Sequence, residues 1–472
     1  MSDEMFVTDR PATFGDVFSS REFRFIFASS TLSWIGDHLA KAAVTALVFH
    51  ETGSVALSAA AFALSYLPWI AGGPLLATIA ERHPYRRVMV ICDLIRMSLI
   101  ALVAIPGIPV WLILFLLFAT ALANPPFQAA RSALLPQLLQ GDRYVVGLSL
   151  QQSTGQAAQI AGYALGGAIA PFYPRVALLL NAATFAVSAV LIAVGLGDRR
   201  PIGRPLHNHL ARDTADGFRV VFGTPVLRAI ALLVFTSMLF AIVPEGLAAA
   251  WAAELADNES DRGWMQAMIM VANPIGFILG GIVVGRLIRP DLRRRLIRPF
   301  AVLAPLALVP ALLGPPVGGI ALMAAVCGFA VAGMMPPANG LFVQALPAAY
   351  RARAFGVMQG GMQVTQGVAV IATGILADRF GIPAVVGFWS LAGVVLLLAT
   401  SSSWPAKETI AATVHAAQLA NEETEREGRV NGVRLDGAGN TPPDGLGTHT
   451  LARRRAMMGL SQPSTEHGEA NA

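Results

Sequence analysis

Long apolar runs alternate with short polar connections along the chain. About 20 helical residues, each rising about 1.5 Å, cross the roughly 30 Å hydrocarbon core of a bilayer. Twelve runs approach or exceed that length, at residues 23–48, 55–80, 87–105, 109–134, 145–170, 174–196, 229–252, 263–288, 296–313, 317–346, 352–377 and 383–403. The pattern predicts an all-α polytopic membrane protein with twelve transmembrane helices.

Composition supports a membrane protein. Of the 472 residues, 55 % are hydrophobic and 13 % are charged, whereas soluble domains carry about 25 % charged residues. The basic character does not indicate nucleic-acid binding, because the arginines lie in short connections between apolar runs. Cys92 and Cys327 fall in different runs, which argues against a disulfide or a metal site. We expect no cofactor and no metal.

The arginines orient the predicted helices. They gather in alternate connections, whereas the opposite connections hold only Arg175, Arg262 and Arg379. Positive residues stay on the cytoplasmic side of a membrane. We therefore expect a multi-pass protein of the cell (inner or plasma) membrane with both termini in the cytoplasm.

A polar, proline-containing stretch divides the chain into two halves. The predicted parts are a cytoplasmic N-terminal segment (1–22), a six-helix bundle (23–197), a cytoplasmic central loop (198–228), a second six-helix bundle (229–404) and a mostly disordered cytoplasmic tail (405–472). Within the loop, Phe218, Val221 and Phe222 share one helix face, as in an interfacial helix. His207 and His209 lack a third ligand, which favours a solvated loop. In the tail we expect a short helix near Ala411–Glu423.

The two halves are related by an internal repeat. The motif Pro125-Pro126 recurs as Pro336-Pro337, and Asp37 recurs as Glu245. Two stripes of glutamines also correspond, namely Gln152, Gln156 and Gln159 with Gln359, Gln363 and Gln366. Amides are unfavourable against lipid, so each stripe is expected either to line a wet cavity or to hydrogen-bond helices together. Paired halves suit alternating access, in which one half rocks against the other.

Acidic residues inside apolar runs mark candidate functional sites, because charge in a membrane is costly. Asp37 is a candidate proton carrier or substrate ligand, but Lys41 lies one turn away and could hold it in a static ion pair. His38 points to another side and is expected to be a core histidine. Glu245 has no basic neighbour one turn away on its helix, and its position predicts either a proton-carrying acid or a wet one near the outer surface.

The connection after the second run reads Ala77-Thr78-Ile79-Ala80-Glu81-Arg82-His83-Pro84-Tyr85-Arg86-Arg87. It resembles the signature G-x-L-A-D-R-x-G-R-R of the major facilitator superfamily, and the resemblance covers roughly residues 20–404. It implies the major facilitator fold, with a cytoplasmic gate formed by contacts between the acid Glu81 and arginines among Arg82, Arg86 and Arg87. The alternative is that these arginines only set topology. Three further charged residues are expected to belong to this gate, namely Asp93, Arg96 and Arg131. Asp93 and Arg96 are expected to neutralise each other, and Arg131 to reach the membrane edge.

A second motif, Gly162-Tyr163-Ala164-Leu165-Gly166-Gly167, is similar to the G-P-x-x-G-G of proton-coupled exporters, with Tyr163 in place of proline. With Gly217-Phe218-Arg219 it resembles the third drug:proton antiporter branch, which includes macrolide-efflux and siderophore-export proteins. The resemblance implies Gly162, Gly166 and Gly167 as an exporter motif.

The resemblance implies proton-coupled efflux of a small amphipathic organic compound. Nutrient import and lysolipid flipping remain open. An enzyme is not expected, because neither HExxH nor GxSxG occurs and no connection is long enough for a catalytic domain; a sensor is equally remote. The expected partners are a small-molecule substrate, protons and the lipid bilayer, with no nucleic acid, and the expected state is a monomer.

Overall fold

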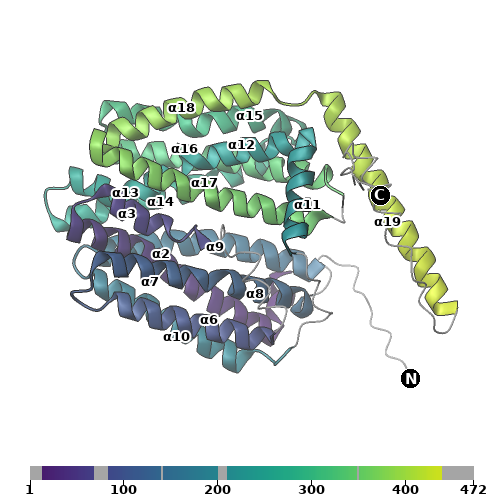
Figure 1. The fold of residues 1–472 in the computed structure, drawn as a ribbon, viewed down its shortest axis with the longest axis horizontal. Helices are drawn as coiled ribbons and strands as arrows, with labels where there is room; N and C mark the ends of the chain where they lie inside the picture. The colour runs from purple at the N-terminus through teal and green to yellow at the C-terminus, as the bar shows by residue number, and fades with distance from the viewer. Residues whose placement is uncertain (1–12, 69–82, 140–141, 200–209, 348–349, 438–472) are drawn as a thin grey trace, which may run out of the picture. The chain divides into compact units, whose positions relative to one another are not determined.

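The computed structural model describes residues 13–68, 83–139, 142–199, 210–347 and 350–437. Regular structure in these residues is helical throughout (Figure 1). The first half contains α1 (Phe14–Phe18), α2 (Arg21–Thr52), α3 (Val55–Ala63), α6 (Tyr85–Val103), α7 (Val110–Leu122), α8 (Asn124–Leu138), α9 (Asp142–Ile169) and α10 (Pro174–Gly195). The expectation of an all-α chain is confirmed.

The second half continues the same pattern. Its helices are α12 (Pro225–Ala241), α13 (Val243–Leu255), α14 (Glu259–Leu287), α15 (Pro290–Leu306), the 3-10 turn η1 (Val309–Leu313), α16 (Val317–Gln344), α17 (Arg351–Phe380) and α18 (Ile382–Ser402). Among the described residues, eight helical spans are long and apolar enough to cross a membrane. This confirms a polytopic membrane protein.

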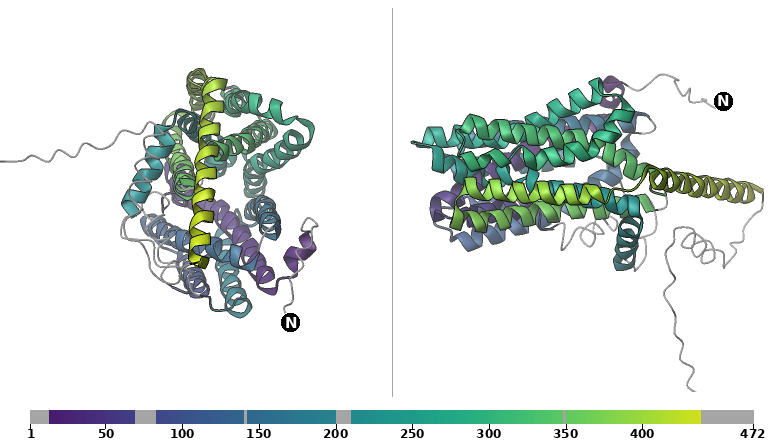
Figure 2. Two further views of the ribbon diagram at one scale, coloured as in Figure 1. Left: turned by 90° about the vertical axis from the view of Figure 1, so that its right-hand side faces the viewer. Right: turned by 90° about the horizontal axis from the view of Figure 1, so that it is seen from above.

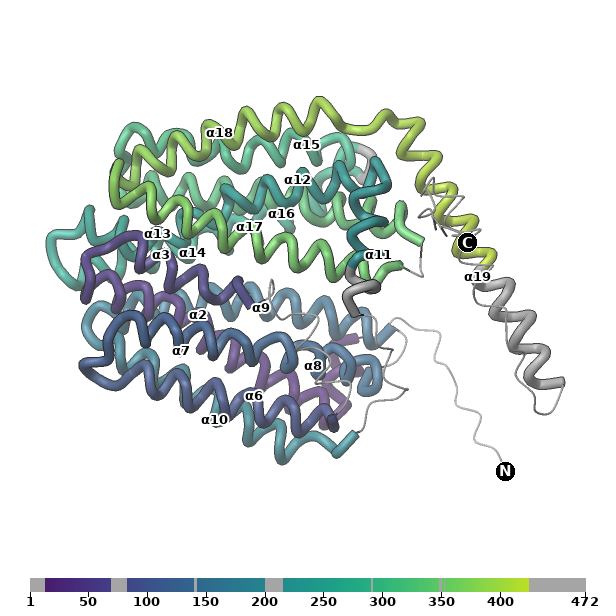
Figure 3. The backbone as a smooth tube through the Cα atoms, viewed as in Figure 1, coloured from purple at the N-terminus to yellow at the C-terminus, as the bar shows by residue number. Residues whose placement is uncertain are grey.

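Prolines interrupt three of the predicted helices. The expected run 109–134 forms α7 and α8, with Pro125 in the first turn of α8. Similarly, α13 begins at Val243-Pro244, and η1 contains Pro310. A proline inside a helix removes a backbone donor and clashes with the preceding turn, so it ends or kinks the helix. Figure 3 traces α7 and α8 as successive segments.

The described residues form two compact units. Unit 1 takes its residues from 1–210, 234–337 and 359–399, and unit 2 from 211–233, 338–358 and 400–472. Both halves of the chain contribute to unit 1, whose helices are seen nearly end-on in the left view of Figure 2. The division does not follow the boundaries expected at residues 197 and 229, so the two six-helix bundles stay a prediction.

Unit 2 contains the helix expected in the central loop, α11 (Leu210–Gly223), and the tail helix α19 (Lys407–Gly437). Val221 is fully buried whereas Phe218 is 50 % exposed, so the predicted apolar face is partly covered by protein. A Cβ on Gly217 would lie 2.9 Å from the carbonyl oxygen of Arg353 on α17. The tail helix is longer than the expected segment Ala411–Glu423, because good helix formers such as Ala, Gln and Glu dominate it.

Small residues let α2 pack closely within unit 1. A Cβ on Gly36 would overlap Asn181 and Thr184 on α10, and a Cβ on Gly162 of α9 would lie 2.5 Å from the carbonyl oxygen of Ile35. Two glycines of the expected exporter motif, Gly162 and Gly166, therefore lie at the close contact between α9 and α2. Helix α2 also packs against α10.

The two halves of the chain also meet within unit 1. A Cβ on Gly167 of α9 would overlap Ala267 of α14, and Gln266 Nε2 donates a hydrogen bond of 2.9 Å to the carbonyl oxygen of Ala42. Asp378, near the end of α17, accepts hydrogen bonds from Ser54 Oγ at 2.8 Å and from the Val55 backbone N–H at 2.7 Å. A carboxylate at the first turn of α3 also interacts favourably with the helix dipole.

Substitution Gly162→Leu is expected to lower the thermal stability of the purified protein, because the new side chain must displace the α2 backbone. Overpacking of this kind costs about 1–3 kcal/mol. The control is Gly281→Leu on α14, where nothing lies within 4 Å of a Cβ. Thermal unfolding in detergent measures both, and equal melting temperatures for the two variants would contradict the close α2–α9 contact.

Candidate functional site

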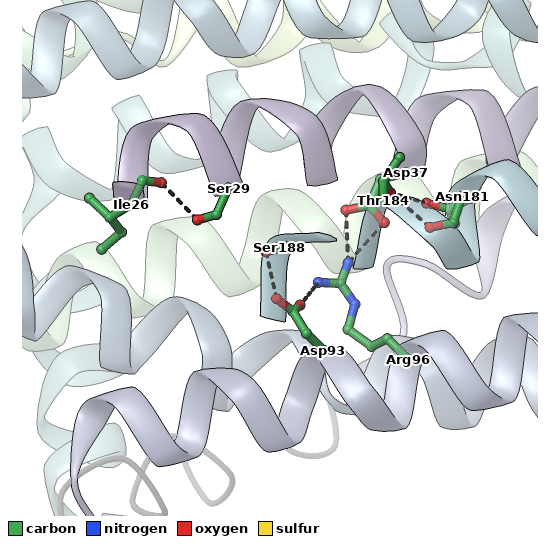
Figure 4. Close-up of polar contacts among 8 residues, drawn as sticks. All are labelled: Ile26, Ser29, Asp37, Asp93, Arg96, Asn181, Thr184 and Ser188. Atoms are coloured by element: carbon green, nitrogen blue, oxygen red, sulfur yellow. Dashed lines mark hydrogen bonds and ion pairs between the residues drawn. The ribbon is translucent and has the colours of Figure 1, made fainter. Parts of the chain in front are cut away.

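A buried charge network joins α2, α6 and α10 inside the first half. Arg96 Nη2 on α6 donates to both carboxylate oxygens of Asp37 on α2, each at 2.8 Å. Arg96 Nη1 lies 3.5 Å from Asp93 Oδ1, and Ser188 Oγ on α10 donates to Asp93 Oδ2 at 2.6 Å. Figure 4 shows Arg96 between the two carboxylates.

The expected ion pair of Asp93 and Arg96 is present, and Arg96 also binds Asp37. Of the alternatives left open for Asp37, the structure shows an ion pair, but its partner is Arg96. Helical spacing revealed Lys41 as a neighbour of Asp37, but it could not reveal a partner on another helix. Arg96 is only 4 % exposed, and its Cζ lies 4.0 Å from the ring centroid of Phe185. We conclude that Asp93 and Arg96 belong to an interior network.

Lys41 lies among aromatic rings. Its Nζ is 5.0 Å from the ring centroid of Tyr66 and 5.6 Å from that of Phe62, both within cation–π range. In the described part of the chain no ion pair joins Lys41 to Asp37, but the Lys41 charge interacts electrostatically with Asp37 and with Glu245. Lys41 therefore lies within electrostatic range of both Asp37 and Glu245, the two acids that correspond in the internal repeat.

Glu245, in the first turn of α13, is held by side chains from the other half of the chain. Tyr163 Oη on α9 donates to Glu245 Oε2 at 3.0 Å, and Gln159 Nε2 lies 3.5 Å from the same oxygen. Glu245 is 4 % exposed and Tyr163 is 1 % exposed, so the acid is buried rather than wet. The tyrosine that replaces the motif proline is thus a partner of the acid.

His38 packs against the same tyrosine. The two ring centroids are 5.0 Å apart, with the rings nearly perpendicular. His38 Nδ1 is buried, and no described residue forms a hydrogen bond with it. The expected core histidine therefore lies beside the Glu245 site, and it also reaches the cavity described next.

A polar cavity of about 650 Å³ lies within the first half. Trp34 and His38 contribute to its wall from α2. Its other polar side chains are Gln128 and Arg131 from α8 and Ser149, Gln151, Gln152, Gln156 and Gln159 from α9. The first glutamine stripe thus lies on a cavity wall, and Gln159 also contacts Glu245. Arg131 Cζ lies 4.8 Å from the ring centroid of Trp34, and its expected reach to the membrane edge stays a prediction.

The second glutamine stripe is arranged differently. Gln359 is exposed, and Gln363 and Gln366 are partly exposed along α17. The polar cavity is lined by first-half residues only, so the symmetry of the repeat does not extend to it. The choice between cavity lining and helix pairing stays open for this stripe.

A second, apolar cavity of about 790 Å³ lies between α9, α14 and α16. Small residues such as Ala164, Gly167 and Ala325 form part of its wall, and Trp264 and Leu322 add larger apolar surface. Both of these large side chains are more than half exposed.

The gate motif is only partly described. Glu81 and Arg82 lie outside the described residues, as do His207 and His209. Arg87 Nη2 lies 3.5 Å from Asp198 Oδ2, and both side chains are well exposed. A gate formed with Glu81 therefore stays a prediction. Within the described ranges no cluster of three His, Cys, Asp or Glu side chains could hold a metal ion.

Sequence analysis missed four residues that the structure brings into these sites. Gln128 and Gln151 line the polar cavity, Gln266 bonds α14 to α2, and Asp378 caps α3. Each is a polar residue in or next to an apolar run, so the cost of polar groups in lipid was an available signal. Tyr163 gave no such signal, because its role depends on a residue in the other half.

Comparison with known proteins identifies the family. The family model of the Major Facilitator Superfamily matches residues 26–322 and 247–420. Macrolide efflux protein A of Streptococcus pyogenes is 22 % identical over 388 residues, which cover 80 % of this chain and 93 % of that protein.

Solved structures agree on the fold. A structure of a variant of the nucleoside transporter NupG has a TM-score of 0.63 at 17 % identity and covers 81 % of this chain and 100 % of that one. A structure of the peptide transporter POT in complex with sulfate has a TM-score of 0.60 at 16 % identity, covering 83 % of this chain and 95 % of that one. The chain therefore belongs to the Major Facilitator Superfamily and is a secondary transporter, not an enzyme.

Proposed function

We propose that this transporter exports a small amphipathic organic compound in exchange for protons, by alternating access. The observation that carries the proposal is the buried carboxyl group of Glu245, whose two hydrogen-bond partners, Tyr163 and Gln159, come from the opposite half of the chain. A proton carrier must be a titratable group whose surroundings change when the halves move. Glu245 meets that requirement.

Burial couples the charge of Glu245 to the contact between the halves. An ionised carboxylate in a closed apolar interface is costly, whereas a neutral acid can stay there in a hydrogen bond. Loss of the proton therefore favours opening around Glu245, and gain of a proton favours the closed interface. In an ensemble of two states, a ligand shifts the population by its differential affinity for them, and here the proton is that ligand.

Asp37 is assigned a different role. Both of its carboxylate oxygens accept hydrogen bonds from Arg96, which ties α2 to α6. We therefore propose that Asp37 positions α2, which carries Trp34, His38 and Lys41, and that Glu245 carries the proton.

The direction of transport is supported by similarity to macrolide efflux protein A, which aligns over 93 % of its length. The arginine distribution supports cytoplasmic termini. With that orientation, the contacts of Asp378 with α3 and of Gln266 with α2 lie at the outer end of the helices, and the described state is closed to the outside. A cell-membrane location follows from the same proposal.

Lysolipid flipping is a second candidate, because the apolar cavity beside Trp264 and Leu322 could take an acyl chain. Flipping in vesicles that lack a proton gradient, or accumulation of substrate inside cells, would favour this function or import over proton-driven export.

Substitution Glu245→Gln is expected to abolish proton-driven efflux, with at least a tenfold lower rate, because the amide cannot exchange a proton. The control is Glu254→Gln on the same helix, where the side chain is exposed. A panel of drugs and dyes is assayed in an exporter-deficient host, with and without an uncoupler. Efflux by Glu245→Gln at the wild-type rate and still sensitive to the uncoupler would refute the assignment.

The ion pair of Asp37 and Arg96 can be tested by a double-mutant cycle. Because a hydrogen bond to a charged group contributes about 1.5–3 kcal/mol, Asp37→Asn and Arg96→Gln should each lower the melting temperature. The double variant should lose less stability than the sum of the two. Asp257→Asn, at an exposed position, is the control. Strictly additive losses would show that the pair does not stabilise the protein.

A further inference from the structure

We infer that the polar cavity binds the anionic group of an aromatic organic anion, with Arg131 pairing with the anion and Trp34 stacking on the flat body. The inference rests on the proposed transport function and specifies its substrate class. The first evidence for an anionic ligand is the charge of the cavity wall. Arg131 is a cation, and no carboxylate lies among the lining residues.

Arg131 is partly buried, and one of its buried donor atoms lacks a partner in the described part of the chain. Among the described residues no carboxylate forms an ion pair with it, and its Nη1 atom is buried without a hydrogen-bond partner. Buried charges are normally paired and hydrogen-bonded. The described protein therefore leaves both a charge and a donor to be satisfied, which a carboxylate, sulfonate or phosphate would do.

The contact between Arg131 and Trp34 leaves this role open. A cation–π contact uses the face of the guanidinium, whereas carboxylates and phosphates bind the N–H donors at its edge. Trp34 also lies on the cavity wall beside His38, so aromatic surface adjoins the cation.

The remaining lining supplies neutral hydrogen-bonding groups. Five glutamines and Ser149 line the cavity, and Gln151 Nε2 is a second buried donor that has no partner among the described residues. Such a wall can bind the acceptors of an anion, but offers a cationic ligand no counter-charge. The nearby acid Glu245 is not part of the lining and is already held by Tyr163. A volume of about 650 Å³ falls within the range of small-molecule sites.

The apolar cavity between α9, α14 and α16 provides a contrast. It has no charged side chain, so it would not distinguish an anion from a cation. Charge selection is therefore assigned to Arg131 alone.

The test measures binding of five naphthalene probes to the purified full-length protein in nanodiscs, by isothermal titration calorimetry. Three are anions (1-naphthylacetate, 1-naphthalenesulfonate and 1-naphthyl phosphate), one is neutral (1-naphthylacetamide) and one is a cation (1-naphthylmethylammonium). At least one anion should bind at least tenfold more tightly than the neutral and cationic probes. Arg131→Gln should remove that preference, and Arg131→Lys should retain part of it.

Arg228→Gln, an exposed substitution outside the cavity, is the matched control and should bind the anions as the wild type does. If no anion binds the wild type more tightly than the amide and the ammonium, the inference is overturned, whether or not Arg131→Gln folds. Anion binding that survives in a folded Arg131→Gln variant also overturns it. Glu245→Gln should still bind the anion, so loss of anion preference and loss of proton coupling are separate results.

Discussion

A hydrogen-bonded acid between the two halves of the chain is the constraint on which this account of the transporter depends. Glu245 contributes the carboxyl group, and Tyr163 and Gln159 contribute the hydroxyl and the amide. Tyr163 and Gln159 lie on α9, which packs closely on α2 at Gly162 and on α14 at Gly167. These glycines therefore fix the position of the helix that carries both donors.

The charged side chains fall into two sets that differ in what they contact. Asp37, Asp93 and Arg96 form ion pairs with one another and join helices of the first half. Arg131 and Lys41 contact aromatic rings rather than acids in the described residues. A cation that contacts only an aromatic ring can still pair with an anionic ligand. A cation that binds two carboxylates has fewer hydrogen-bond donors free for a ligand. This difference separates the positioning network from the proposed binding and coupling residues.

Much of the fold could be predicted from the sequence, because the cost of polar groups in lipid marks each helix. The twelve runs, the helix in the central loop and the family followed from hydropathy, arginine placement and short motifs. The site was harder to predict. Asp37 and Glu245 were found as acids in lipid, but their partners Arg96 and Tyr163 lie on other helices, and spacing along one helix indicated Lys41 instead. The prolines between α7 and α8 are visible in the sequence, but the apolar run 109–134 continues through them and so does not indicate two helices.

Infrared difference spectroscopy of the purified protein tests the central claim most directly, because it detects a protonated carboxyl group and its hydrogen bonding. The account predicts a carboxylic-acid C=O band that is absent in Glu245→Gln and shifted in Tyr163→Phe, which removes the hydroxyl donor. It also predicts that the band is lost when the proton is released on the alkaline side. A band unaffected by both substitutions, or no difference between wild type and Glu245→Gln at any pH, would contradict it.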